Sequence, residues 1–109
     1  MLNDTKDLKL HDKVKLYEIM ATQIWKSHLE YPTGLWSGTP VLYIYSNKYA
    51  TYKKPAELDK NYYLFQIIKG TSEYEVMMIG ENFDEVVKKG NELQDAYRIE
   101  HFEKNEDNY

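Results

Sequence analysis

The feature that most constrains the fold is a row of strand-like runs, separated by turns, between Pro40 and Ile79. The runs are rich in Tyr, Val, Ile and Phe, which favour β-strands. They predict four strands, at Pro40–Ser46, Tyr49–Lys53, Asn61–Lys69 and Glu73–Ile79. Because the connections are short, neighbouring strands should pair antiparallel in a meander, with one short helical turn in the polar connection Pro55–Lys60.

A helix is predicted before these strands, from about Asp12 to Leu29. It should end near Tyr31, because the residue before a proline is pushed out of helical geometry. Asp4 and Thr5 are alternative N-caps for an earlier start. The prediction depends on apolar residues that recur at three- and four-residue spacing, namely Val14, Leu16, Tyr17, Met20, Ala21, Ile24, Trp25 and His28.

A second helix is predicted after Asn82, which has Glu85 three residues further on in a pattern close to a capping box. Gly90 costs about 1 kcal/mol relative to Ala inside a helix, but it allows close packing on the sheet. Residues 98–104 fit either more helix or a short edge strand, and we expect helix. The apolar face of this helix consists of Phe83, Val86, Val87, Leu93, Ala96 and Tyr97.

The predicted order is therefore α-β-β-β-β-α, an α+β fold. We expect a four-stranded antiparallel meander with the N-terminal and the C-terminal helix packed on one face. The 109 residues suit one domain, 1–109, with frayed ends near 1–4 and 104–109.

Composition excludes several classes of site. The chain has no cysteine, which excludes disulfides and thiolate metal sites. Its net charge is −4, which argues against binding driven mainly by a phosphate backbone. The first residues carry charges throughout, and no apolar run approaches the roughly 20 residues of a membrane span. We therefore expect a cytoplasmic protein without a signal peptide or membrane partner.

The tyrosines allow two interpretations. Tyr43, Tyr45, Tyr62 and Gln66 are expected on a mixed sheet face, opposite the face that the helices cover. They can form cross-strand packing pairs, each contributing roughly 0.2–1 kcal/mol. They can also form a contact surface, because tyrosine is enriched at interface centres. Trp36 lies in a loop rich in Gly and Pro, and we expect it to plug the core rather than contact a partner.

No motif indicates catalysis. No glycine-rich phosphate loop occurs, no serine lies in a GxSxG pattern, and the three histidines lack metal-ligand spacing. We therefore predict no catalytic residues, no metal and no cofactor. An enzyme whose site is assembled in space ranks last among the hypotheses.

The leading hypothesis is a small non-enzymatic protein-binding module, an inhibitor or regulator that occupies a partner's surface. Immunity proteins and phage-encoded anti-defence proteins share this profile, and acidic side chains of the second helix would suit nucleic-acid mimicry. The alternative is a nucleic-acid or nucleotide binder that uses Tyr43, Tyr45, Tyr49 and Tyr62 with Lys48, Lys53 and Lys54. The candidate partner-binding residues are Tyr43, Tyr45, Tyr49, Tyr62, Trp36, Glu81, Asp84, Glu85, Glu92 and Asp95.

Overall fold

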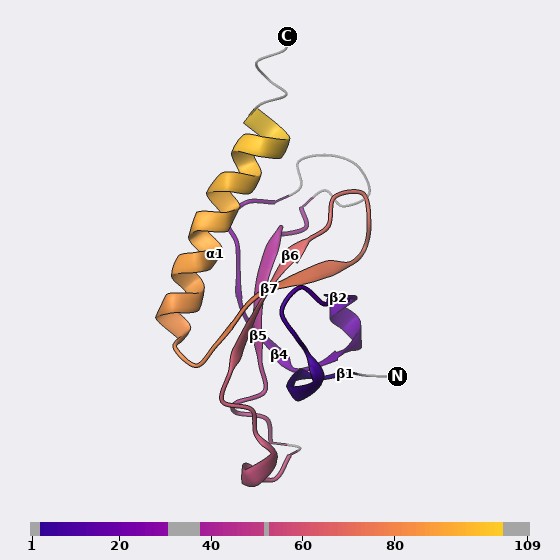
Figure 1. Ribbon diagram of the computed structural model, residues 1–109, viewed down its shortest axis with the longest axis vertical. Helices are drawn as coiled ribbons and strands as arrows, with labels where there is room; N and C mark the ends of the chain where they lie inside the picture. Colours follow the sequence, from indigo (N-terminus) through magenta and orange to yellow (C-terminus); the bar gives the residue numbers. More distant parts are fainter. Residues whose placement is uncertain (1–2, 31–37, 52, 104–109) are drawn as a thin grey trace.

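The computed structural model describes residues 3–30, 38–51 and 53–103 (Figure 1). Within these ranges, five strands form an antiparallel sheet in the order β2-β7-β6-β5-β4. Two short strands, β1 (Asn3–Asp4) and β3 (Ile19–Met20), pair in parallel beside it. The α+β class and the antiparallel sheet are therefore confirmed. The strands of the main sheet are β2 (Lys13–Val14), β4 (Thr22–Lys26), β5 (Leu42–Ser46), β6 (Tyr62–Ile67) and β7 (Tyr74–Gly80).

The second predicted helix is confirmed. Helix α1 (Phe83–Arg98) begins after Asn82, whose side-chain oxygen accepts a hydrogen bond from the Glu85 backbone N–H at 3.1 Å. It continues into a π-helical turn, η4 (Ile99–Glu103), so the chain after Arg98 is helical as expected. No helix in the described ranges is both long enough and apolar enough to cross a membrane.

The predicted N-terminal helix is wrong. Residues 12–29 form β2, β3 and β4 instead, and the described part of the chain contains only one α-helix. The 3-10 turns η1 (Thr5–Asp7) and η2 (Leu16–Glu18) are the only helical pieces described before β4. The burial pattern explains the error: Ile19, which the predicted apolar face omits, is buried, whereas Tyr17 and Ile24 are exposed.

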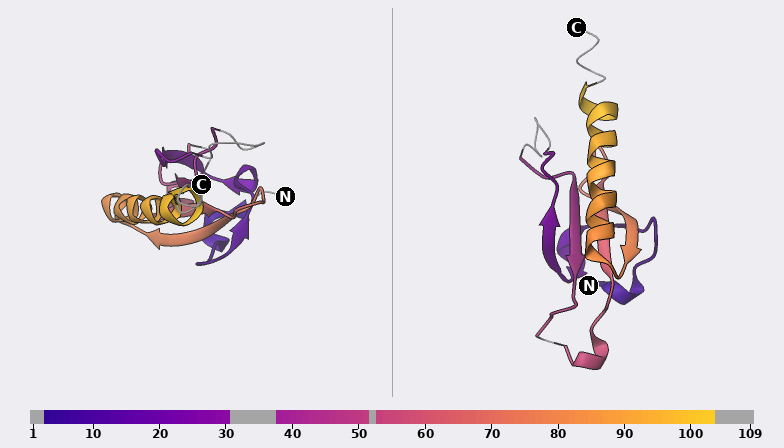
Figure 2. Two further views of the ribbon diagram at one scale, coloured as in Figure 1. Left: turned by 90° about the horizontal axis from the view of Figure 1, so that it is seen from above. Right: turned by 90° about the vertical axis from the view of Figure 1, so that its left-hand side faces the viewer.

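This N-terminal segment, residues 3–20, contributes the edge strand β2 to the sheet and otherwise lies on the sheet face that α1 leaves open. Figures 1 and 2 show α1 on one side of the sheet and the N-terminal segment on the other. Leu8 and Ile19 join the same hydrophobic core as the buried residues of β5 and β6. The sheet therefore lies between a helix and an irregular layer, and the two predicted helices do not share one face.

The second predicted strand, Tyr49–Lys53, is also wrong. Tyr49 to Thr51 and Lys53 belong to no strand, and Tyr52 lies outside the described residues. The long connection between β5 and β6 instead projects beyond the end of the sheet (Figure 1). It contains the 3-10 turn η3 (Pro55–Glu57), which confirms the predicted short helical turn. The chain turns at Asn47, whose carbonyl accepts a hydrogen bond from the Ala50 N–H at 3.0 Å.

Gly90 lets α1 approach the sheet closely, as expected. A Cβ atom at this position would lie 2.9 Å from Cη2 and 3.1 Å from Cζ3 of Trp25 on β4. It would also lie 3.4 Å from Cδ1 of Leu64 on β6. The first of these distances is shorter than side chains tolerate, so the indole ring occupies the space that a side chain would need.

We expect Gly90→Ala to lower the free energy of unfolding by about 1 kcal/mol in urea denaturation. The helix gains about 1 kcal/mol in propensity, but overpacking costs typically about 1–3 kcal/mol. Trp25→Phe replaces the indole by a smaller phenyl ring that does not extend to the positions of Cη2 and Cζ3. In that background Gly90→Ala should become stabilising. An equal loss in both backgrounds would show that contact with Trp25 is not the cause.

Candidate functional site: a pocket beside strand β4

Tyr43 and Tyr45 lie half-buried on the sheet face opposite α1. The Tyr43 ring centroid is 5.5 Å from that of Tyr74, and the Tyr45 centroid is 5.6 Å from that of Phe65. The Tyr74 hydroxyl donates a hydrogen bond to the Pro40 carbonyl at 3.1 Å. The contacts of Tyr43 and Tyr45 therefore match the interpretation of these rings as sheet packing.

Tyr62 and Gln66 do not share the face of Tyr43, contrary to expectation. The strand register places Tyr43 opposite Phe65 and Leu42 opposite Gln66. Side chains alternate along a strand, so the even-numbered residues of β6 point toward α1. The Tyr62 ring accordingly lies 5.3 Å from the ring of Phe83 in α1. The pairing register, which the sequence did not reveal, causes the difference.

The five predicted acidic residues are all exposed on or just before α1: Glu81, Asp84, Glu85, Glu92 and Asp95. Basic side chains lie between these acidic residues along the helix. Lys88 and Lys89 lie one helical turn from Asp84 and Glu85, a spacing at which opposite charges attract. Asp95 pairs with Arg98 at 3.9 Å. The acidic face is therefore partly neutralised within the helix. Trp36, the remaining aromatic candidate, lies outside the described residues.

An apolar pocket of about 220 Å³ lies where the chain leaves β5. We call it the β4 pocket. Two of its lining residues, Ile24 and Tyr49, are large apolar side chains that are 40% and 78% exposed. The structure thus brings together the predicted Tyr49 and Tyr62, which are distant in sequence. The complete lining is Thr22 and Ile24 of β4, Ser46 of β5, Tyr49 and Ala50 of the connection, and Tyr62 of β6.

Lys48 places a positive charge beside this pocket. Its Nζ lies 5.7 Å from the ring centroid of Tyr49 and 5.6 Å from that of Tyr62, within the range of cation–π attraction. Interaction with the Tyr62 side chain, and then with Tyr49, raises the pKa of Lys48, which keeps it an ammonium. Chemically, the site can accept an apolar side chain and attract an anionic group next to it.

A β-bulge in β4 orients the Ile24 side chain toward the pocket. The pairing of β4 with β5 shifts between Gln23 and Trp25, so Ile24 has no partner residue on β5. Ile24 shares the β4 pocket with Tyr62, and Trp25 contacts Gly90, so both side chains lie on the α1 side. Bulges commonly re-aim a side chain in this way. Sequence reasoning missed Thr22 and Ile24 because it placed them in a helix, although Thr22, Ile24 and Trp25 are residue types that favour a strand.

The other two predicted lysines differ in environment. Lys53 Nζ pairs with Asp4 Oδ2 at 2.9 Å and its side chain is only 8% exposed. This contact, followed by the Lys6 backbone N–H, lowers the pKa of Asp4. Lys54 is exposed. Lys53 therefore ties the β5–β6 connection to the N-terminal segment rather than presenting its charge to a ligand.

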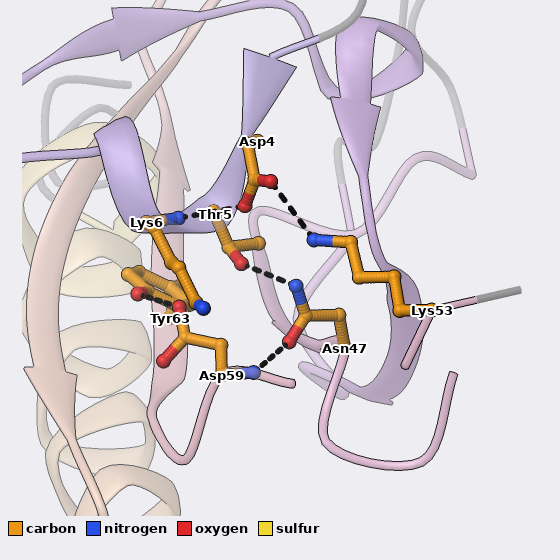
Figure 3. A network of polar contacts seen from close by, with 7 residues as sticks. All are labelled: Asp4, Thr5, Lys6, Asn47, Lys53, Asp59 and Tyr63. Carbon is orange, nitrogen blue, oxygen red and sulfur yellow. Dashed lines mark hydrogen bonds and ion pairs between the residues drawn. The ribbon is translucent and has the colours of Figure 1, made fainter. Parts of the chain in front are cut away.

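Four buried residues hold the connection in place, and we call them the Asn47 network (Figure 3). Asn47 Nδ2 donates to Thr5 Oγ1 at 2.8 Å, and Asn47 Oδ1 accepts from the Asp59 N–H at 2.7 Å. The Tyr63 hydroxyl donates to Asp59 Oδ2. The network thus joins both ends of the connection to each other and to the N-terminal segment. It fixes the position from which Tyr49 reaches the pocket.

Away from the pocket, His11 Nδ1 lies 2.7 Å from Glu75 Oε2. His11 also has a positive φ of 71°, which non-glycine residues adopt uncommonly. In the described ranges, no serine or threonine hydroxyl forms a hydrogen bond with His11, and no three His, Asp or Glu side chains gather as metal ligands. The pair fastens the segment before β2 to β7.

Comparison of this chain with family models, with curated proteins and with solved structures gives no match. Its function is therefore inferred from the geometry around the β4 pocket.

We expect Asn47→Ala to lower the free energy of unfolding by about 2–3 kcal/mol, measured by urea denaturation. The change leaves the Asp59 N–H without its acceptor in a buried site, and each such group costs about 1–3 kcal/mol. Lys54→Ala, an exposed change in the same connection, should stay within about 0.5 kcal/mol of the wild type. Equal stabilities of the two variants would contradict a structural role for the Asn47 network.

Four buried or half-buried tyrosines predict a loss of stability in alkali. Burial raises the pKa of Tyr43, Tyr45, Tyr63 and Tyr74, and for Tyr63 the hydrogen bond to Asp59 adds to the effect. Above about pH 10, the pKa of an unperturbed tyrosine, the unfolded chain releases phenolic protons before the folded chain does. The free energy of unfolding should therefore be insensitive to these groups below that pH and should fall above it.

Urea denaturation at a series of pH values measures this slope. Tyr74→Phe removes one of the four phenols with a raised pKa, so the free energy of unfolding should fall less steeply in alkali. An unchanged slope in Tyr74→Phe would contradict the assignment.

Proposed function

We propose that this chain is a small non-enzymatic protein-binding module that engages its partner through the β4 pocket. The observation that carries the proposal is the convergence of exposed Ile24 and Tyr49 on one apolar pocket, with the Lys48 ammonium beside it. Exposed apolar groups that gather around a hollow, with polar groups at the rim, are typical of interaction sites.

Tyr49 is the residue best placed to act as an anchor. Tyrosine combines a large rigid apolar area with a polar tip, and it is enriched among interface residues whose truncation costs about 2 kcal/mol or more. The Asn47 network holds the connection that presents Tyr49, which limits the ordering cost on binding. The role of inhibitor or regulator, including the immunity and anti-defence types, belongs to the same proposal and depends on the partner.

Nucleic-acid binding is the second candidate, favoured by the position of Lys48 against Tyr49 and Tyr62. This arrangement resembles the mixture of cations and stacking rings that binds single strands. Affinity for a single-stranded oligonucleotide that falls steeply with salt would favour this candidate.

A photo-crosslinking residue at position 49 tests the proposal. Benzoylphenylalanine replaces Tyr49 in one variant and Tyr17 in a second, since these tyrosines are similarly exposed at 78% and 73%. Irradiation in lysate of the source cells or their host should yield a discrete protein adduct from position 49 and none from position 17. Equal adducts at both positions, or none at position 49, would count against the pocket as the binding site.

A charge-reversal variant separates the pocket from nucleic-acid mimicry by α1. Glu92→Lys combined with Asp95→Lys reverses two exposed carboxylates of the helix. Crosslinking from position 49 should survive this change if the pocket carries the binding. Loss of the adduct would assign the main contact to the acidic helix.

A further inference from the structure

We propose that the partner binds as an extended acidic strand that adds to the free edge of β4 and places an apolar side chain in the β4 pocket. This inference rests on the proposed function and specifies the kind of partner that the site fits.

Strand β4 offers an open edge. It is the terminal strand of the five-stranded sheet, and β5 is its only partner in the described ranges. Figure 2 (right) shows β4 at the margin of the sheet. The backbone N–H and C=O groups along such an edge are a template for a strand of another chain. The opposite edge strand, β2, has two residues against five in β4, and short edge strands resist this pairing.

The charge around this edge is positive although the chain as a whole is acidic. β4 and the connection 47–61 together hold five lysines and two carboxylates, whereas the whole chain has a net charge of −4. One of the two carboxylates, Asp59, is buried in the Asn47 network, and one of the five lysines, Lys53, is paired with Asp4. Charge complementarity therefore favours a partner segment with carboxylates, which the exposed Lys26 of β4 is placed to attract.

The pocket also constrains which side chains the added partner strand carries. Strand residues alternate between the two faces of a sheet, so every second side chain of an added strand would lie on the α1 side of β4. Ile24 and Tyr62, on that side, offer an apolar pocket of about 220 Å³ with Lys48 beside it. A segment that alternates apolar and acidic residues would place its apolar side chains in the pocket and its acidic side chains on the opposite face of the sheet, where Lys26 lies beside Tyr43.

The test uses three labelled peptides and the whole protein in a fluorescence-polarisation assay. One peptide alternates glutamate with leucine, the second replaces glutamate by lysine, and the third is the acidic peptide methylated on alternate backbone nitrogens. We expect the acidic peptide to bind about tenfold more tightly than the basic one. Methylation should abolish binding, because it removes the backbone donors that strand addition uses. Equal binding of all three peptides would overturn the inference.

Matched variants locate the binding. Ile24→Lys puts a charge in the pocket and should abolish binding, whereas Ile99→Lys makes the same change at an exposed isoleucine of η4 and should leave it intact. Lys26→Gln should weaken binding of the acidic peptide about two- to fivefold. Lys54→Gln, at an exposed lysine of the connection between β5 and β6, should have a smaller effect. Equal losses for both members of either pair would overturn the assignment to β4.

The remaining outcomes separate this inference from the proposed function. A protein adduct from position 49 without binding of the acidic peptide would refute strand addition and leave the module proposal standing. A dimer in light scattering that Ile24→Lys disrupts would mean that the edge pairs with a second copy, which also overturns the inference. Hydrogen exchange on the peptide complex should show new protection in β4, and unchanged exchange there would contradict strand addition.

Discussion

The rest of the structure depends on the burial of strand β6 on both faces. Its side chains alternate between two sides of the sheet, yet all except Gln66 are buried. A strand of this kind needs cover on each side, and α1 supplies it on one side alone. Residues 3–20 must therefore spread over the other side. The segment forms short strands and 3-10 turns because it follows a sheet surface rather than packing as a separate rod.

The Asn47 network links this N-terminal layer to the candidate site. Thr5 belongs to the layer, Asn47 and Asp59 to the connection between β5 and β6, and Tyr63 to the central strand. Buried polar groups are costly unless each finds a partner, so these residues fix one another's positions. The same hydrogen bonds that close the second layer thus determine where Tyr49 lies. Stability and the shape of the β4 pocket are coupled through them.

The tyrosines of this chain divide into groups with different environments. Tyr43, Tyr45 and Tyr74 pack ring against ring on the sheet face opposite α1, where their area contributes to the core. Tyr49 is exposed on the projecting connection and lines the pocket. Tyr62 also lines the pocket, but its ring packs on Phe83 of α1. Residue type alone does not distinguish these groups, because tyrosine favours strands, cores and interfaces alike. The strand register separates Tyr43 and Tyr45 from Tyr62, and Tyr49 is exposed because it lies on a connection outside the strands.

Local signals in the sequence determined β5, β6, β7 and α1, since each combines a strong strand run or an N-cap with turn residues at its ends. Asn82 and the turn at Pro55 act over a few residues, so the sequence is sufficient to interpret them. The N-terminal third was different, because apolar residues at helical spacing there are shared among three short strands that bury different side chains. Only the tertiary structure decided that these residues form strands, because covering the open face of β6 stabilises the fold more than the local helical periodicity does. It also decided the register that places Tyr43 and Tyr62 on opposite faces of the sheet, because register depends on pairing between residues far apart in the chain. The same register brings Tyr62 into the pocket between β4 and the connection.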